Sequence, residues 1–178
     1  VKKHLNKDSL VDLKIAIQGV GHVGYHLTKH LKEAGAKVLV SDLDQNALKL
    51  VVNDFGVEII KVEDIYDADI DIYSPCAMGA TLNDDTIPKL KCSIVAGSAN
   101  NQLKNETKHA RMLKKQNILY APDYAINSGG LINCANEIEG YNRTRAFRQA
   151  EGIYDTLMNI YDRAERDDVT THEAALKE

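Results

Sequence analysis

Apolar positions in the first third of the chain alternate between two periods. Short runs rich in Ile and Val, typical of strands covered on both faces, occupy residues 13–18, 37–41 and 57–61. Longer stretches with apolar side chains at steps of three and four, each followed by a glycine, occupy residues 23–34 and 44–55. This alternation of strand and amphipathic helix predicts right-handed crossovers and a parallel sheet.

The same rhythm continues, less regularly, in the second half. Further strands are predicted at residues 71–74, 93–96 and 118–121, and a polar helix at 106–116 precedes the last of them. Six strands in this arrangement predict an α/β fold, a Rossmann-type doubly wound and mostly parallel sheet.

A long helix is predicted over residues 142–167, with a narrow apolar seam. The seam comprises Phe147, Ala150, Tyr154, Leu157, Tyr161 and Ala164. It could cover the sheet or pack on something outside this chain. We expect it to be partly exposed or covered by a second copy.

The domain plan predicted from these patterns has three parts. Residues 1–12 read as the end of a preceding connecting helix, 13–141 as the sheet domain and 142–178 as a helical extension. Because Val1 replaces an initiator methionine and the opening resembles the tail of a helix, we expect an incomplete chain.

Composition narrows the class of protein. The 178 residues are 44% hydrophobic, enough for a core, and the net charge of −4 comes without a basic stripe, which disfavours nucleic acid. No apolar run approaches the roughly 18 residues of a membrane span. Three cysteines in unrelated segments suggest reduced thiols, and we expect a cytoplasmic location.

A glycine motif follows the first predicted strand and opens the first helix. In this context GxGxxG is typical of a dinucleotide phosphate cradle, whereas alone it would suggest only a structural turn. The first glycine permits the turn, the second lets the pyrophosphate approach and the third lets helix and strand pack. The motif comprises Gly19, Val20, Gly21, His22, Val23 and Gly24.

Asp42 ends the second strand about 20 residues beyond the glycines, and we expect Asp42 and the following Leu43 to contact the cofactor. A carboxylate there accepts hydrogen bonds from adenosine ribose hydroxyls and repels a 2′-phosphate, so we predict NAD as cofactor. Asp42 could instead be a turn or capping residue. A methyltransferase is disfavoured by the spacing of Gly24 and by Gln18, which stands where those enzymes often carry an acid.

Loops after the later strands should face the nicotinamide ring, because ligands of open parallel sheets bind beyond the carboxyl ends of the strands. One loop is a run of mostly small residues that includes Cys76 and Ala77, and another carries Ser98. A third places Asn127, whose amide can match a carboxamide, before two glycines.

Four blocks together resemble the C-terminal, NAD-binding domain of the leucine dehydrogenases in the Glu/Leu/Phe/Val dehydrogenase family. They are GVGHVGYHL, SPCAMGATLNDDTIP, AGSANNQL and APDYAINSGGLIN, and the resemblance spans Leu13 to about Asp155. It implies that Cys76, Ala77 and Asn127 lie along the nicotinamide riboside. It also implies that Asn101 touches the amino-acid substrate.

The resemblance further implies that Leu131 and Cys134 line the pocket for an aliphatic side chain. Leucine dehydrogenases commonly carry valine at both positions, so the preference among branched-chain substrates is open. The implied activity is NAD-dependent oxidative deamination to a 2-oxo acid and ammonia, in a homo-oligomer. No catalytic residue is expected in this chain, because the family's catalytic lysines lie in an N-terminal domain absent here.

Three alternatives concern other readings of these residues. A non-catalytic NAD(H)-sensing module would share the same fold. His22, His26 and His30 recur every four residues, but no carboxylate or cysteine completes a metal site, and none is expected. Cys76 could be a nucleophile, although no nearby base is identifiable and a packing role is favoured.

Overall fold

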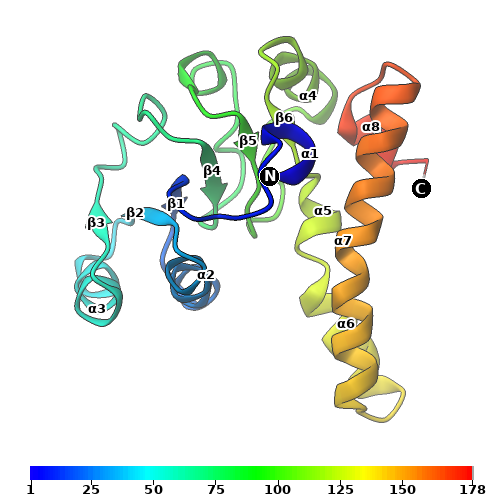
Figure 1. Ribbon diagram of the computed structural model, residues 1–178, viewed down its shortest axis with the longest axis horizontal. Coiled ribbons are helices and arrows are strands. Elements are labelled where there is room, and N and C mark those ends of the chain that lie inside the picture. Colours follow the sequence, from blue (N-terminus) through cyan, green and yellow to red (C-terminus); the bar gives the residue numbers. More distant parts are fainter. Residues whose placement is uncertain (178) are drawn as a thin grey trace.

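The computed structural model describes residues 1–177 as an α/β unit with a long helical arm at one side (Figure 1). Neighbouring strands all run parallel, in the order β3-β2-β1-β4-β5-β6, which confirms the doubly wound sheet. The strands are β1 (Lys14–Gln18), β2 (Lys37–Ser41), β3 (Glu58–Ile59), β4 (Ile72–Pro75), β5 (Ile94–Val95) and β6 (Leu119–Tyr120).

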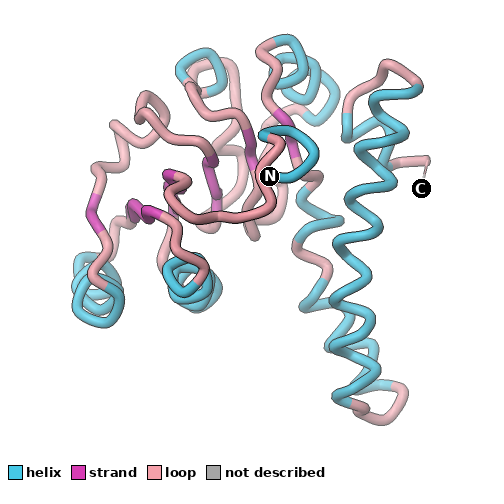
Figure 2. The backbone as a smooth tube through the Cα atoms, in the orientation of Figure 1, coloured by secondary structure: helices cyan, strands magenta, loops and turns pink. Residues whose placement is uncertain are grey.

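Helices cover both faces of the sheet (Figures 1 and 2). The helices are α1 (Lys2–Leu5), α2 (His22–Glu33), α3 (Gln45–Phe55), η1 (Ile87–Lys89), α4 (Glu106–Lys115), α5 (Asp123–Ile126), α6 (Gly129–Ile138), α7 (Arg143–Arg166) and α8 (Thr171–Ala175). Ile15 and Ile17 of β1 belong to the core under α2 and α3, whereas Ala16 belongs to the core on the other face. Side-chain alternation along the strand thus feeds two hydrophobic cores.

Local signals set the helix ends where the sequence predicts them. Asp44 caps α3 by accepting a hydrogen bond from the Asn46 amide at 2.8 Å, and Gly56 ends the helix with a φ of 60°. Asn105 caps α4 through the Lys108 amide at 2.9 Å.

Several sequence predictions need correction, and the strands predicted at 93–96 and 118–121 pair over only Ile94–Val95 and Leu119–Tyr120. The opening helix covers only Lys2–Leu5, because Asn6 adopts the left-handed conformation and stops it. The third strand pairs over only Glu58–Ile59. In α2, Val23 is exposed rather than inward, since the helix approaches the sheet through the small residues Gly24 and Thr28.

The long helix α7 is confirmed within one residue at each end, but its packed stripe is rotated from the predicted seam. Phe147 and Tyr154 are exposed, whereas Ala146 and Ile160 are buried. The reason is the position of its neighbours. α5 and α6 lie along one side of α7, and α8 folds back against its last turns (Figure 1).

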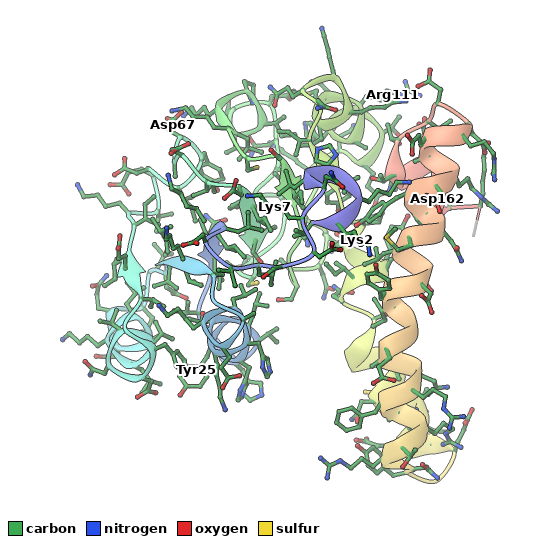
Figure 3. The ribbon with its side chains drawn as sticks, viewed as in Figure 1. Lys2, Lys7, Tyr25, Asp67, Arg111 and Asp162 are labelled. Carbon is green, nitrogen blue, oxygen red and sulfur yellow. The ribbon has the colours of Figure 1, made fainter. Side chains whose placement is uncertain are left out.

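Ion pairs join this last part of α7 and α8 to the sheet domain. Arg111 of α4 lies 3.0 Å from Glu173 of α8, and Lys114 lies 2.7 Å from Asp168. Asp162 of α7 pairs with Lys3 of α1. Figure 3 labels Arg111 and Asp162 at this end of the arm. The other end of α7, with α6, extends beyond α2 and away from the sheet (Figure 1).

Within residues 1–177, no helix combines the length and apolar character needed to cross a membrane.

Candidate functional site

The turn after β1 packs backbone against backbone. Gly19 has a φ of 99°, and a Cβ added to it would lie 2.6 Å from the amide nitrogen of Ala77. A Cβ on Gly24 would lie 2.0 Å from the Gly19 carbonyl oxygen. Only glycine fits at these two positions, so the first and third glycines have the structural roles that the motif predicts.

Gly21 differs from the other two glycines because open space surrounds it. A Cβ built there meets no atom within 4 Å. Gly21 is the N-cap of α2, and no side chain caps this helix. Since the first amides of a helix have no acceptor within it, these donors remain available beside an open approach. This arrangement fits a diphosphate, whose charge the helix dipole would also favour.

Asp42 lies beside this turn and connects it to the end of β2. One carboxylate oxygen accepts a hydrogen bond from the Val20 amide at 2.7 Å, and the other accepts from the Asp44 amide at 2.9 Å. A carboxylate has about four acceptor sites, so two remain for ribose hydroxyls. Asp42 therefore stabilises the turn, as the alternative interpretation from sequence suggests, and still has free acceptor sites for a ligand. Leu43, predicted to flank the cofactor, is 85% exposed.

The loops after β4, β5 and β6 interlock at the same edge of the sheet. The Ala80 amide donates to the Asn101 carbonyl at 2.7 Å, joining the first loop to the second. The Gln102 amide donates to the Asp123 carboxylate at 2.8 Å, joining the second loop to the start of α5. Ala77 packs on Gly19, which connects this group to the glycine turn.

The predicted nicotinamide residues occupy these loops, together with Asn101, the predicted contact to the amino-acid substrate. The side-chain amide of Asn127 donates to the Asn100 side-chain oxygen at 2.5 Å and to the Ser98 carbonyl oxygen at 3.4 Å. Asn101 adopts a left-handed φ of 51° and is exposed. Cys76 is half-buried, its Sγ 3.6 Å from the Ser74 hydroxyl. Ser98, Asn101 and Asn127 are thus placed on joined loops.

Leu131 and Cys134, predicted to line the pocket for the substrate side chain, are not part of this group of loops. Both lie on α6 with exposed side chains, and Leu131 is 74% exposed. The described residues therefore do not enclose a pocket around Leu131 and Cys134, and the predicted contact of these two residues with a substrate side chain stays a prediction.

Two buried polar residues lie beneath the loops, Gln102 and Gln18, and neither their burial nor their hydrogen bonds were predicted from the sequence. Gln18 accepts a hydrogen bond from the Tyr73 hydroxyl at 2.5 Å and donates to the Tyr66 hydroxyl at 3.0 Å. Burial raises the pKa of Tyr73, which keeps its hydroxyl protonated as a donor. A glutamine at a strand end within an otherwise apolar run was the available signal.

No metal centre emerges in the part of the chain that the structure describes, since no group of three His, Cys, Asp or Glu side chains converges there. His22 and His26 contact edge to face, with ring centroids 5.0 Å apart, and His30 lies near Glu33. The three cysteines are free thiols.

Comparisons with known proteins identify the family. Residues 40–177 match the family model of Glutamate/Leucine/Phenylalanine/Valine dehydrogenase. The chain belongs to this dehydrogenase family. It is 49% identical over 174 residues to leucine dehydrogenase from Thermoactinomyces intermedius, covering 98% of this chain and 47% of the relative. It is 47% identical over 175 residues to L-tryptophan dehydrogenase from Nostoc punctiforme, covering 98% of this chain and 50% of the relative.

Solved structures give the same answer for the fold. The crystal structure of the L-tryptophan dehydrogenase from Nostoc punctiforme superposes with a TM-score of 0.97 at 46% identity, covering 99% of this chain and 54% of that one. A glutamate dehydrogenase from Thermus thermophilus, described as hetero-hexameric, shares the fold with a TM-score of 0.76 at 19% identity, covering 98% of this chain and 46% of that one.

The chain therefore spans about half the length of the relatives it matches. The predicted family is confirmed. The relatives' names include leucine, tryptophan and phenylalanine dehydrogenases at similar identities, so leucine specificity stays a prediction. The assignment of this segment to a particular half of the longer chains also stays a prediction.

Proposed function

We propose that this chain is the NAD-binding part of an amino-acid dehydrogenase that oxidatively deaminates leucine or another branched-chain L-amino acid. The observation that carries this proposal is the glycine turn, where the open Gly21 and the uncapped start of α2 lie beside Asp42. When bound, the cofactor supplies the hydride acceptor for amino-acid oxidation. The chain's own contribution is binding and orientation.

The amides of the glycine turn would bind the pyrophosphate, and Asp42 would accept the ribose hydroxyls. The loops with Cys76, Ala77, Ser98 and Asn127 would hold the nicotinamide riboside. Asn101 would contact the amino acid, and Leu131 and Cys134 would border its side chain once the rest of the enzyme covers α6. We place the protein in the cytoplasm as a homo-oligomer.

The choice of NAD over NADP is tested by titrating the chain with NADH and NADPH. We expect at least about tenfold preference for NADH, because the Asp42 carboxylate repels a 2′-phosphate. Asp42→Asn should reduce this preference. Asp44→Asn is the matched control, since asparagine caps α3 as well as aspartate does and the charge lost lies two residues away. Equal affinities of the unmodified chain for both nucleotides would exclude the role of Asp42.

Catalysis is tested by mixing the chain with NAD and L-leucine and following NADH absorbance. We expect no turnover, because the groups that activate water belong to the domain predicted to precede this one. Clear turnover would place catalytic groups within this chain. A non-catalytic NAD(H)-sensing module remains the alternative, and a reading frame without a dehydrogenase substrate domain beside this segment would favour it.

A further inference from the structure

Gln102 is a completely buried polar side chain at the centre of the loop after β5. Its side-chain amide donates to two carbonyl oxygens of its own loop, Gly97 at 2.8 Å and Ala99 at 2.9 Å. These bonds draw residues 97–102 into a closed loop around one side chain. Its Oε1 atom is buried without a partner among the described residues, which is unfavourable for a polar atom. Packing alone therefore does not explain a glutamine here.

Asp123 extends this arrangement to the segment after β6. One carboxylate oxygen accepts from the Gln102 backbone amide at 2.8 Å, and the other accepts from the Tyr124 amide at 2.8 Å. The Asp123 amide in turn donates to the Tyr120 hydroxyl at 3.3 Å. Burial and the Asp123 charge raise the pKa of Tyr120, so this hydroxyl stays protonated.

The closed loop has little freedom to shift as a unit. A Cβ on Gly97 would lie 2.2 Å from the Pro75 carbonyl oxygen, so the loop is pressed against the end of β4. Asn101, immediately before Gln102, holds a left-handed φ of 51°. The exposed side chains of Asn100 and Asn101 therefore take their positions from the buried residue that follows them.

We propose that Gln102 and Asp123 form a positioning clamp that orders the loops after β5 and β6 for the nicotinamide half of the cofactor. This inference rests on the proposed function. The clamp sets the places of Ser98, Asn101 and Asn127, and it does not itself touch the ligand. The glycine turn and Asp42, which serve the adenosine half, are held by separate contacts.

The test compares two probes, NADH and ADP-ribose, which lacks the nicotinamide ring. In Gln102→Met, a side chain of similar size leaves the Gly97 and Ala99 carbonyls without their donor. We expect NADH affinity to fall about tenfold and ADP-ribose affinity to change less than about twofold. Gln116→Met, at an exposed position at the end of α4, is the matched control and should leave both affinities unchanged.

Asp123→Asn provides a second variant if Gln102→Met fails to fold. The Gln102 and Tyr124 amides donate to different oxygens of the Asp123 carboxylate, and asparagine has an NH₂ group in place of one of them, so one backbone amide would lose its acceptor. It should lower the ratio of NADH to ADP-ribose affinity in the same direction. A merely structural role would lower thermal stability and weaken both probes together, leaving this ratio unchanged.

The possible outcomes separate this inference from the proposed function. If the unmodified chain binds both probes and the variants keep its affinity ratio, the clamp is wrong and the NAD site stands. If the unmodified chain binds NADH no better than ADP-ribose, the loops contribute no binding energy for the nicotinamide ring, and the clamp proposal is also wrong. If it binds neither probe, the proposed function itself fails.

Discussion

The glycine turn and the free end of the arm use the same residue type in opposite ways. At the turn, Gly19 and Gly24 touch backbone so closely that a single methyl group would collide. In the arm, Gly129, Gly130 and Gly152 have nothing within 4 Å of a built Cβ. The turn is completed by its own neighbours, whereas the free end of the arm presents open surface, including the exposed rings of Phe147 and Tyr154.

The largest effect should come from adding one methyl group at the turn. Gly24→Ala places Cβ 2.0 Å from the Gly19 carbonyl oxygen, and we expect a loss of about 3 kcal/mol in the free energy of unfolding, measured by urea denaturation. Gly152→Ala is the matched control, a helical glycine with open space around it. It should gain about 0.5–1 kcal/mol. Equal effects at both positions would remove the distinction between the two regions.

The next effect concerns a buried and an exposed position on α7. Ile160 is 1% exposed within the small core shared with α8, and Ile160→Ala should cost about 2–3 kcal/mol. Tyr154→Ser, two turns earlier and 59% exposed, should change stability by less than about 0.5 kcal/mol. Thermal unfolding of both variants checks this. A large loss in Tyr154→Ser would mean that the free end of the arm is covered in solution.

The smallest effect concerns the attachment of the arm through Glu173. The Thr170 amide and Arg111 lower the pKa of the Glu173 carboxyl to about 2. A lowered folded-state pKa stabilises the protein above the unfolded value, near 4.5, and this contribution is lost as pH falls through 2. The side chain is 30% exposed, so we discount the contribution to about 1 kcal/mol at pH 7.

Glu173→Gln should therefore be less stable than the unmodified protein at pH 7, and most of this difference should disappear as pH falls from 4.5 to 2, as measured by urea unfolding at pH 7 and pH 2. Asp167→Asn is a suitable comparison, since Asp167 pairs with its sequence neighbour Arg166 at the end of α7 rather than joining α8 to α4. A stability gap in Glu173→Gln that persists at pH 2 would show that the effect is not due to the carboxylate charge.

Sequence predicted best where a local rule decides the structure. The caps Asp44 and Gly56, the glycine turn and the two periods of the early strands and helices act within a few residues of each other. The predicted placement of Ser98 and Asn127 on neighbouring loops followed from the rule that carboxyl ends of parallel strands meet at one edge.

Features that depend on contacts between distant segments were not predicted from these local patterns. The buried stripe of α7 is rotated from the predicted seam because α8 packs against this helix. The apolar pattern of α7 alone does not indicate where a later helix will pack. Val23 is exposed because α2 packs against the sheet through the small residues Gly24 and Thr28. A prediction based on apolar positions overlooks such small residues. The roles of Gln102 and Asp123 depend on a hydrogen bond across 21 positions.

The return of α8 also closes one side of the sheet to intruding chains. β6, an outermost strand, is contacted by α8 and α4, so its free side is shielded by helices. The opposite outermost strand, β3, pairs over only two residues, which offers a very short template for a foreign β-segment. We therefore expect aggregation by edge-to-edge β-pairing to be disfavoured as long as α8 stays packed against α4 and β6.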